Sequence, residues 1–205
     1  YNQKILTEAI AKSGVKEGDI VFCHSNIGYF GIPEEGRDTK TICSLVLNAF
    51  MSVLGKTGTF VSPTFTYSFG SNSKDKVFDP DNTPSGMGVF AEMVRRHPRA
   101  RRSVEPMFSV AALGRQAEEL VNDVSDECFG KDSFWDRFLQ GDGRVCNLNF
   151  DAATTPCASA RTTAISIDYK TTVIDLNKAS AHHAAPHLRG ESRQTCQVIA
   201  CFTVG

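Results

Sequence analysis

The sequence has almost no net charge and little that marks a nucleic-acid-binding or membrane protein. Its 205 residues include 22 Lys and Arg against 23 Asp and Glu, a formal net charge of −1. Without a surplus of basic residues, bulk electrostatics does not favour binding to nucleic acid or to an anionic membrane. No apolar run approaches the roughly 18 residues that a membrane-spanning helix needs, and no signal-peptide pattern opens the chain. We therefore expect a cytoplasmic protein without nucleic-acid or membrane partners.

The sequence also lacks regular cysteine spacing. Seven cysteines are present, and none belongs to a Cys-x-x-Cys pair, so free thiols are expected rather than a zinc site or a disulfide framework. His182, His183 and His187 form a cluster of metal-ligand type, but no acidic residue or cysteine stands at a matching spacing. We expect no bound metal, and a metal-dependent hydrolase that uses these histidines remains an alternative.

Common nucleotide-binding and hydrolase motifs are missing as well. There is no Walker loop, no dinucleotide-binding fingerprint, no G-x-S-x-G nucleophile elbow and no HExxH pair. With 205 residues the chain suits one ordinary domain that buries roughly 70% of its unfolded surface.

What is present is an alternation of helical and strand patterns, which predicts an α/β domain. A strand, a helix and a strand in succession form a β-α-β unit with parallel strands. Ligands bind at the carboxyl ends of such strands, which places His24 and Ser25 at the same rim as residues 64–67. His24 beside Ser25 is either a base with a nucleophile or a structural turn. The predicted strands are 19–25, 59–67, 107–113 and 144–150, and the predicted helices are 2–13, 39–54, 87–97, 115–121 and one that Ser133 caps.

The stretch 58–88 is the most informative part of the chain. Pro63 lies inside a run of β-branched and aromatic residues, so this strand is either an edge strand or breaks there into a loop. The loop that follows has no helical or strand period, yet it contains aromatic residues and prolines. Long loops in compact domains are often functional, and we predict that this one faces a substrate.

The predicted helix 87–97, with Ser85 as its cap, ends in a concentrated positive patch. Five arginines lie within residues 95–102. They are either a solvated helix end, where cations interact well with the helix dipole, or a phosphate site. Glu92 lies on the core-facing side of this helix, where a carboxylate is either paired or functional because burying it alone is costly.

Seven short motifs occur in a fixed order along the chain. They are His24-Ser25, 58–67, Phe78-Asp79-Pro80, 83–88, Arg102-Ser103 with Pro106, 109–114 and 129–134. Together they resemble the aminoglycoside 3-N-acetyltransferase family over residues 18–155. The resemblance implies a three-layer α/β/α sandwich that differs from the GNAT acetyltransferases. It also implies transfer of an acetyl group from acetyl-coenzyme A to an amine of an aminoglycoside-like antibiotic or a related small molecule.

The resemblance implies specific site residues. Acetyl transfer needs a general base and donors for the oxyanion, which the family is thought to supply with a Thr-x-x-His motif after the last core strand. Thr155 matches the threonine, but Ala158 stands where the histidine is expected, and Glu92 is the candidate carboxylate partner. The implied coenzyme A neighbours are His24, Ser25, Thr64, Thr66, Arg102 and Ser103, and the implied substrate contacts are Tyr67, Phe78 and Asp79.

The composition changes beyond Thr155. The chain holds seventeen aromatic residues up to that point and two afterwards, Tyr169 and Phe202. We expect an acetyltransferase core over 1–155 and a divergent, poorly packed segment over 156–205, for which a shifted reading frame near Pro156 is one explanation. A homodimer is a further expectation. The missing histidine leaves open a second function, a catalytically impaired homologue that binds coenzyme A without transferring acetyl.

Overall fold

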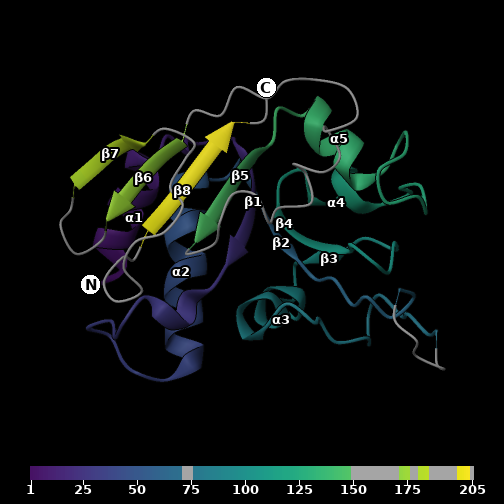
Figure 1. The fold of residues 1–205 in the computed structure, drawn as a ribbon, viewed down its shortest axis with the longest axis horizontal. Coiled ribbons are helices and arrows are strands. Elements are labelled where there is room, and N and C mark those ends of the chain that lie inside the picture. The colour runs from purple at the N-terminus through teal and green to yellow at the C-terminus, as the bar shows by residue number, and fades with distance from the viewer. Residues whose placement is uncertain (71–75, 149–170, 176–179, 185–197, 204–205) are drawn as a thin grey trace.

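A mixed β-sheet forms the middle layer of the computed structural model, which describes residues 1–70, 76–148, 171–175, 180–184 and 198–203. The sheet has eight strands in the order β3-β4-β2-β1-β5-β8-β6-β7 (Figure 1). The strands are β1 Ile20–Ser25, β2 Thr59–Pro63, β3 Arg101–Arg102, β4 Val110–Gly114, β5 Arg144–Leu148, β6 Thr171–Asp175, β7 Ser180–Ala184 and β8 Val198–Thr203. The helices are α1 Gln3–Lys12, α2 Thr39–Leu54, α3 Val89–Arg95, α4 Ala117–Val121 and α5 Phe134–Gln140, with a 3-10 turn at Ile27–Tyr29.

The predicted β-α-β unit is present. β1 runs parallel to β2, with Ile20 opposite Thr59, and parallel to β5 on its other side. The carboxyl ends of β1 and β2 therefore lie at one rim of the sheet. β4 is antiparallel to β2, so its first residue, Val110, pairs with Pro63 at that same rim.

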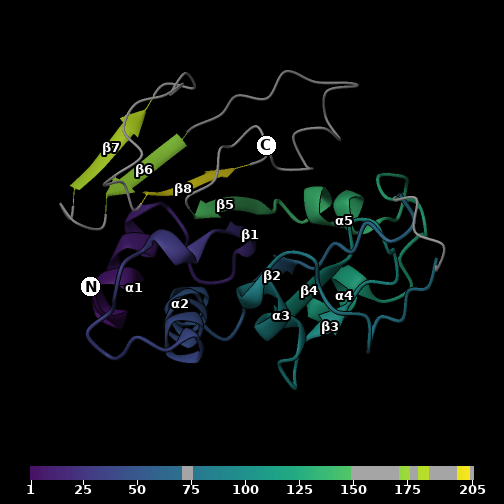
Figure 2. The same ribbon diagram turned by 60° about the horizontal axis from the view of Figure 1, so that its bottom comes forward.

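Helices cover both faces of the sheet, and alternate residues of β1 supply both cores. Val21 and Cys23 pack in one buried cluster with apolar residues of α1, α2 and α3. Ile20 and Phe22 belong to a second cluster formed with α4 and α5. Figure 2 shows α1 and α2 side by side on the same side of β5 and β8. The predicted three-layer α/β/α arrangement is confirmed.

Local sequence explains most helix boundaries. Asp38 caps α2 by accepting a hydrogen bond from the Thr41 amide at 2.9 Å. Ser133 caps α5 as predicted. The predicted cap of α3 is wrong, because Gly88 occupies that position without a side-chain bond, and the Ser85 hydroxyl accepts instead from the Met87 amide.

Pro63 ends β2, which is not an edge strand. β2 pairs with β1 on one side and β4 on the other, so the edge alternative is wrong and the break is confirmed. Pairing with β1 stops at Val61, two residues earlier. The missing N–H of Pro63 therefore costs no bond to β1.

The thiols divide into two kinds. Cys23, Cys43 and Cys128 are free, as expected. Cys146 is disulfide-bonded, which corrects the expectation for this residue. In the backbone register of the sheet, Cys146 of β5 lies opposite Cys201 of β8. The spacing of cysteines along the chain does not disclose this register.

Within the described ranges, no helix is long and apolar enough to cross a membrane. The side chains described contain no group of three or more His, Cys, Asp or Glu that could hold a metal ion. His187 and the side chains of His182 and His183 lie outside the described residues. Thr155, Ala158 and the expected domain boundary after 155 also lie outside them, so these expectations stay predictions.

Candidate functional site

A cavity of about 470 Å³ lies at the carboxyl end of β1. Its volume falls within the range typical of small-molecule sites. Three segments enclose it: the turn after β1, the first turns of α2, and the stretch that leads into α3. The lining residues are Ser25, Asn26, Ile27, Gly28, Thr39, Cys43, Gly86, Met87, Gly88, Val89 and Phe90.

Backbone hydrogen bonds fix the segments around this cavity. The Asn26 amide donates to the Leu148 carbonyl at 2.8 Å, which ties the turn after β1 to the end of β5. The Gly86 amide donates to the Phe65 carbonyl at 2.8 Å, which ties the long loop to the segment after β2. Thr39 is the first residue of α2 and thus lies at the positive end of the helix dipole.

The predicted pair His24 and Ser25 lies at this rim. Ser25 lines the cavity, and His24, which precedes it in β1, is 7% exposed. Burial lowers the pKa of His24 below its ordinary value, so the imidazole is neutral near pH 7. Cys43 faces the same cavity, and burial raises the pKa of its thiol. Neutral groups therefore form this part of the wall.

Thr64 and Thr66 lie beyond the end of β2, and both hydroxyls have protein partners. The Thr64 hydroxyl is within 3.2 Å of the Ser109 hydroxyl and accepts from Arg102 Nε at 3.1 Å. The Thr66 hydroxyl donates to the Pro106 carbonyl at 2.7 Å. Thr64 is completely buried. These contacts connect the rim strands with one another.

Arg102 uses every one of its donors inside the protein. Nε donates to the Thr64 hydroxyl, Nη1 to the Pro80 and Thr83 carbonyls, and Nη2 to the Thr64 carbonyl and the Ser109 hydroxyl. A guanidinium has five N–H groups, so none is left for a phosphate. Burial lowers the pKa of Arg102 to about 10, which leaves it charged at neutral pH. The structure thus argues against the expected contact between Arg102 and coenzyme A.

Ser103 is also turned to structural use. It is 1% exposed, and its hydroxyl accepts from the Val110 amide at 3.0 Å. Its own amide donates to the Val110 carbonyl. This bridge between β3 and β4 argues against a direct contact between Ser103 and a cofactor.

The predicted substrate residues follow β2 and belong to two groups. Phe78 packs under the Arg102 guanidinium, whose Cζ lies 4.8 Å from the centroid of the Phe78 ring. Asp79 accepts hydrogen bonds from the Asp81 and Asn82 amides. Tyr67 is different: the residue is 45% exposed, and its ring packs edge-on against Phe65 and Phe108. Of the three, Tyr67 presents the most open surface to a ligand.

Glu92, the candidate catalytic carboxylate, has three described partners. It pairs with Arg95 at 2.8 Å and Arg96 at 2.6 Å, and it accepts from the Ser85 amide at 2.9 Å. The hydrogen bond from Arg95, helped by those from Ser85 and Arg96, outweighs burial and lowers the pKa of Glu92 to about 2. The carboxylate is therefore ionised at any physiological pH and linked to the long loop.

The arginine patch does not form one phosphate site. Arg95 and Arg96 pair with Glu92, Arg101 pairs with Glu118 at 3.3 Å, and Arg102 is enclosed by the loop. Arg99 lines a separate cavity of about 520 Å³ at the amino end of β2. The five arginines thus have distinct surroundings that their sequence spacing does not reveal.

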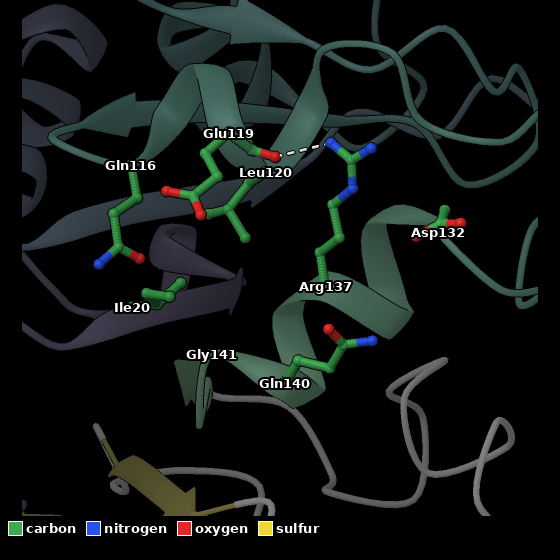
Figure 3. Close-up of a pocket in the computed structure, with 8 residues that line it drawn as sticks. All are labelled: Ile20, Gln116, Glu119, Leu120, Asp132, Arg137, Gln140 and Gly141. Atoms are coloured by element: carbon green, nitrogen blue, oxygen red, sulfur yellow. Dashed lines mark hydrogen bonds between the residues drawn. The ribbon is translucent and has the colours of Figure 1, made fainter.

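Another cavity, of about 480 Å³, lies between α4 and α5 (Figure 3). It includes Ile20, the first residue of β1, and therefore lies at the opposite end of β1 from Ser25. Arg137 projects along it and donates to the Glu119 and Asn122 carbonyls, which closes the carboxyl end of α4. None of the predicted cofactor or substrate residues lines this cavity, so the rim cavity is the better candidate.

The matching family model describes aminoglycoside 3-N-acetyltransferases and covers residues 22–163. This chain belongs to the aminoglycoside 3-N-acetyltransferase family. It is 32% identical over 164 residues to aminoglycoside N(3)-acetyltransferase III of Acinetobacter baumannii, which covers 72% of this chain and 55% of that protein. It is 30% identical to aminoglycoside N(3)-acetyltransferase IX of Micromonospora chalcea over 156 residues. That alignment covers 68% of this chain and 53% of that protein. The chain spans about half the length of these curated relatives.

Solved structures of aminoglycoside acetyltransferases share the fold. "AAC-IIIb binary with CoASH" superposes with a TM-score of 0.69 and 18% identity, over 94% of this chain and 80% of that one. "AAC-VIa bound to Sisomicin" gives a TM-score of 0.70 and 18% identity, over 100% of this chain and 92% of that one. At these identities the likeness shows the fold alone, and it confirms the predicted α/β architecture of the family.

Sequence reasoning identified the rim but missed several residues that line its cavity. Thr39 and Cys43 line it from α2, and neither was singled out as a site residue. A signal was available, because in a β-α-β unit the helix that follows the first strand begins at the same rim. In the sequence, Gly86 and Gly88 stand out only as part of the motif 83–88. Their place beside β1 depends on loop contacts that no sequence periodicity encodes.

Proposed function

We propose that this chain is an acetyl-coenzyme A dependent N-acetyltransferase of the aminoglycoside type, with the rim cavity as part of its acetyl-donor site. The observation that carries the proposal is a cavity bounded by Ser25, the start of α2 and 86–90, in a member of this family. A structural neighbour described as binary with coenzyme A adds support. The acceptor is an amine of an aminoglycoside-like antibiotic or a related small molecule.

The chemistry is a direct transfer. The amine nitrogen attacks the thioester carbon, a C–N bond forms, the C–S bond breaks, and the thiol of coenzyme A leaves with a proton. A general base takes the proton from the attacking ammonium, and hydrogen-bond donors stabilise the oxyanion. Ser25 and residues 26–28 line the cavity and are the proposed contacts of the donor. No metal takes part in this reaction.

The catalytic residues remain predictions. Thr155 is the proposed donor to the oxyanion, and the base is unassigned because Ala158 replaces the expected histidine. Glu92 remains the predicted carboxylate partner, although its bonds to Arg95 and Ser85 favour a structural role. Tyr67 is the proposed acceptor contact, given its open ring.

The same substitution supports a second candidate, a homologue that binds coenzyme A without efficient transfer. Ala158 has no proton-accepting group, and losing a general base typically lowers a rate by about 10²–10⁴-fold. We also include a cytoplasmic location, since the reaction needs a compartment that supplies acetyl-coenzyme A. A homodimer remains part of the proposal.

One experiment separates these candidates. The purified chain is incubated with acetyl-coenzyme A and a panel of aminoglycosides, acetylated product is detected by mass spectrometry, and coenzyme A binding is measured by calorimetry. Product with at least one acceptor supports the enzyme, and binding without product supports the impaired homologue. Neither binding nor product overturns both. Metal analysis after dialysis against zinc tests the hydrolase alternative.

A matched pair of variants locates the site. Gly28→Trp fills the cavity from a position where an added Cβ meets no atom within 4 Å. Ser52→Trp places the same side chain on the exposed face of α2. We expect Gly28→Trp to abolish coenzyme A binding and Ser52→Trp to leave it unchanged.

A further inference from the structure

The loop that leads to the cavity is held by its main chain. Arg102 Nη1 donates to the Pro80 carbonyl at 3.2 Å and to the Thr83 carbonyl. Arg95 Nη1 donates to the Asp81 carbonyl, and the Ser85 amide donates to Glu92. Two arginines and one carboxylate therefore bind the main chain at residues 80, 81, 83 and 85, in a segment that has no regular secondary structure.

Arg102 fastens this segment to the rim of the sheet. Its other donors bind the Thr64 carbonyl at 2.8 Å, the Thr64 hydroxyl and the Ser109 hydroxyl, at the end of β2 and the start of β4. The Phe78 ring covers the guanidinium at 4.8 Å. A planar group with five donors in fixed directions can join a loop and two strand ends, whereas an ammonium has three donors on a flexible stem.

Glu92 and Arg95 fasten the same loop to α3. Both lie on this helix, and Glu92 accepts two hydrogen bonds from Arg95. The Arg95 side chain is only 6% exposed. Val89 and Phe90 at the start of α3 line the cavity, as do Gly86, Met87 and Gly88 just before it. The cavity wall therefore begins one residue after the Ser85 amide that Glu92 holds.

We propose that Arg102 is a positioning residue for the rim cavity, which acts through the main chain of residues 80–83 to hold 86–90 as the cavity wall. Glu92 and Arg95 hold the same loop from α3, and we call these three side chains the clamp. The ligand, coenzyme A, rests on the proposed function; the clamp itself does not. The alternative, direct contact between Arg102 and a phosphate, would need an N–H donor that already has an acceptor in the protein.

Substitutions that keep or remove the charge separate the two roles. Arg102→Lys keeps the positive charge but loses the planar arrangement of five N–H donors, and Arg102→Met loses both. Arg101→Lys is the matched control, since Arg101 is exposed and pairs with Glu118. Hydrogen exchange of residues 80–90 is measured without ligand, coenzyme A binding by calorimetry, and kcat and KM for acetyl-coenzyme A wherever transfer is detected.

For a positioning role, both Arg102 variants exchange faster over 80–90 and bind coenzyme A about tenfold or more weakly. Any transfer shows a raised KM for acetyl-coenzyme A with a smaller change in kcat. Arg101→Lys matches the wild type. If Arg102→Lys binds coenzyme A as tightly as the wild type while Arg102→Met does not, Arg102 acts through its charge and the proposal is overturned. Unchanged exchange over 80–90 in both variants also overturns it.

The two proposals fail in different ways. If the wild type binds no coenzyme A, the proposed function fails, while the exchange measurement still tests the clamp. If coenzyme A binds equally well to the wild type and to both Arg102 variants, the positioning role fails and the function stands. Should Arg102→Met not fold, Glu92→Gln takes its place, because it removes the charge that pairs with Arg95 and accepts from the Ser85 amide, and it is expected to raise exchange over 80–90.

Discussion

Single residues at the rim show how polar groups are used once they are buried. The Thr64 and Ser109 hydroxyls share a hydrogen bond, and both accept hydrogen bonds from Arg102. A buried donor or acceptor left without a partner costs about 1–3 kcal/mol. Removing any one of these three side chains would leave a buried polar group of another without its partner. The group is expected to behave as a unit, and single substitutions within it should not have additive effects on stability.

Glu92 should make stability depend on pH in the acidic range. Hydrogen bonds from Arg95, Ser85 and Arg96 lower its pKa in the folded protein to about 2, against an ordinary value of 4.5. The unfolded chain therefore takes up the proton first, and the stabilisation is complete above pH 4.5 and is lost as the pH falls toward 2. We expect Glu92→Gln to lower the free energy of unfolding most above pH 4.5 and to match the wild type near pH 2, as measured by urea unfolding across pH.

The control for that series is Glu8→Gln, at an exposed position of α1. It should change the free energy of unfolding by no more than about 0.5 kcal/mol at any of these pH values. An equal loss of stability by Glu92→Gln at pH 2 and pH 7 would contradict the ion-pair explanation.

At the scale of elements, α5 depends on its N-cap residue, Ser133, which directly precedes the helix. The Ser133 hydroxyl accepts from the Asp136 amide at 3.2 Å and so satisfies one of the free amides at the helix start. Ser133→Ala should lower the free energy of unfolding by about 1 kcal/mol in urea. Ser52→Ala is the matched change, because the Ser52 hydroxyl only bonds back to the Asn48 carbonyl within α2. It should be neutral or slightly stabilising, since Ala is the better helix former.

Elements with a strong local signal were predictable from the sequence. α2 was predicted over 39–54 and extends over Thr39–Leu54, because an apolar stripe and a terminal glycine specify it locally. β1 and its parallel pairing with β2 followed from the β-α-β order. β3 was missed, because two arginines carry no strand pattern and become a strand only through pairing with Ala111 and Ala112.

The candidate site was predictable only in outline. Ser25 was located correctly at the rim, since strand direction alone determines that position. The use of Arg102 was not predictable, because its acceptors lie up to 38 residues away along the chain. Phosphate binding and loop binding call for the same residue type, and only the folded contacts distinguish them.

At the scale of the whole molecule, β1 joins the two helical layers. Phe22 is completely buried, with its ring centroid 5.0 Å from that of Trp135 and 6.3 Å from that of Phe138. Phe22→Ala should cost about 3–5 kcal/mol of unfolding free energy, a large part of the roughly 5–15 kcal/mol that a domain has. Phe69→Ala, at a side chain that is 42% exposed, is the control and should cost far less.

Urea unfolding followed by both tryptophan fluorescence and circular dichroism checks this expectation. Phe22→Leu should fall between the wild type and Phe22→Ala and keeps the measurement possible if the alanine variant does not fold. Equal stability of Phe22→Ala and Phe69→Ala would show that the α4 and α5 layer does not depend on β1 for its core.

The clamp binds main-chain atoms of the loop: carbonyl oxygens, which every residue has, and one amide, which every residue except proline has. Carbonyls at 80, 81 and 83 and the amide at 85 bind the arginines and Glu92, and none of these contacts uses a loop side chain. Mutation can therefore change the side chain at 81 while the path of the loop stays the same. A loop anchored in this way tolerates a new side chain there without any change to the cavity wall that follows it.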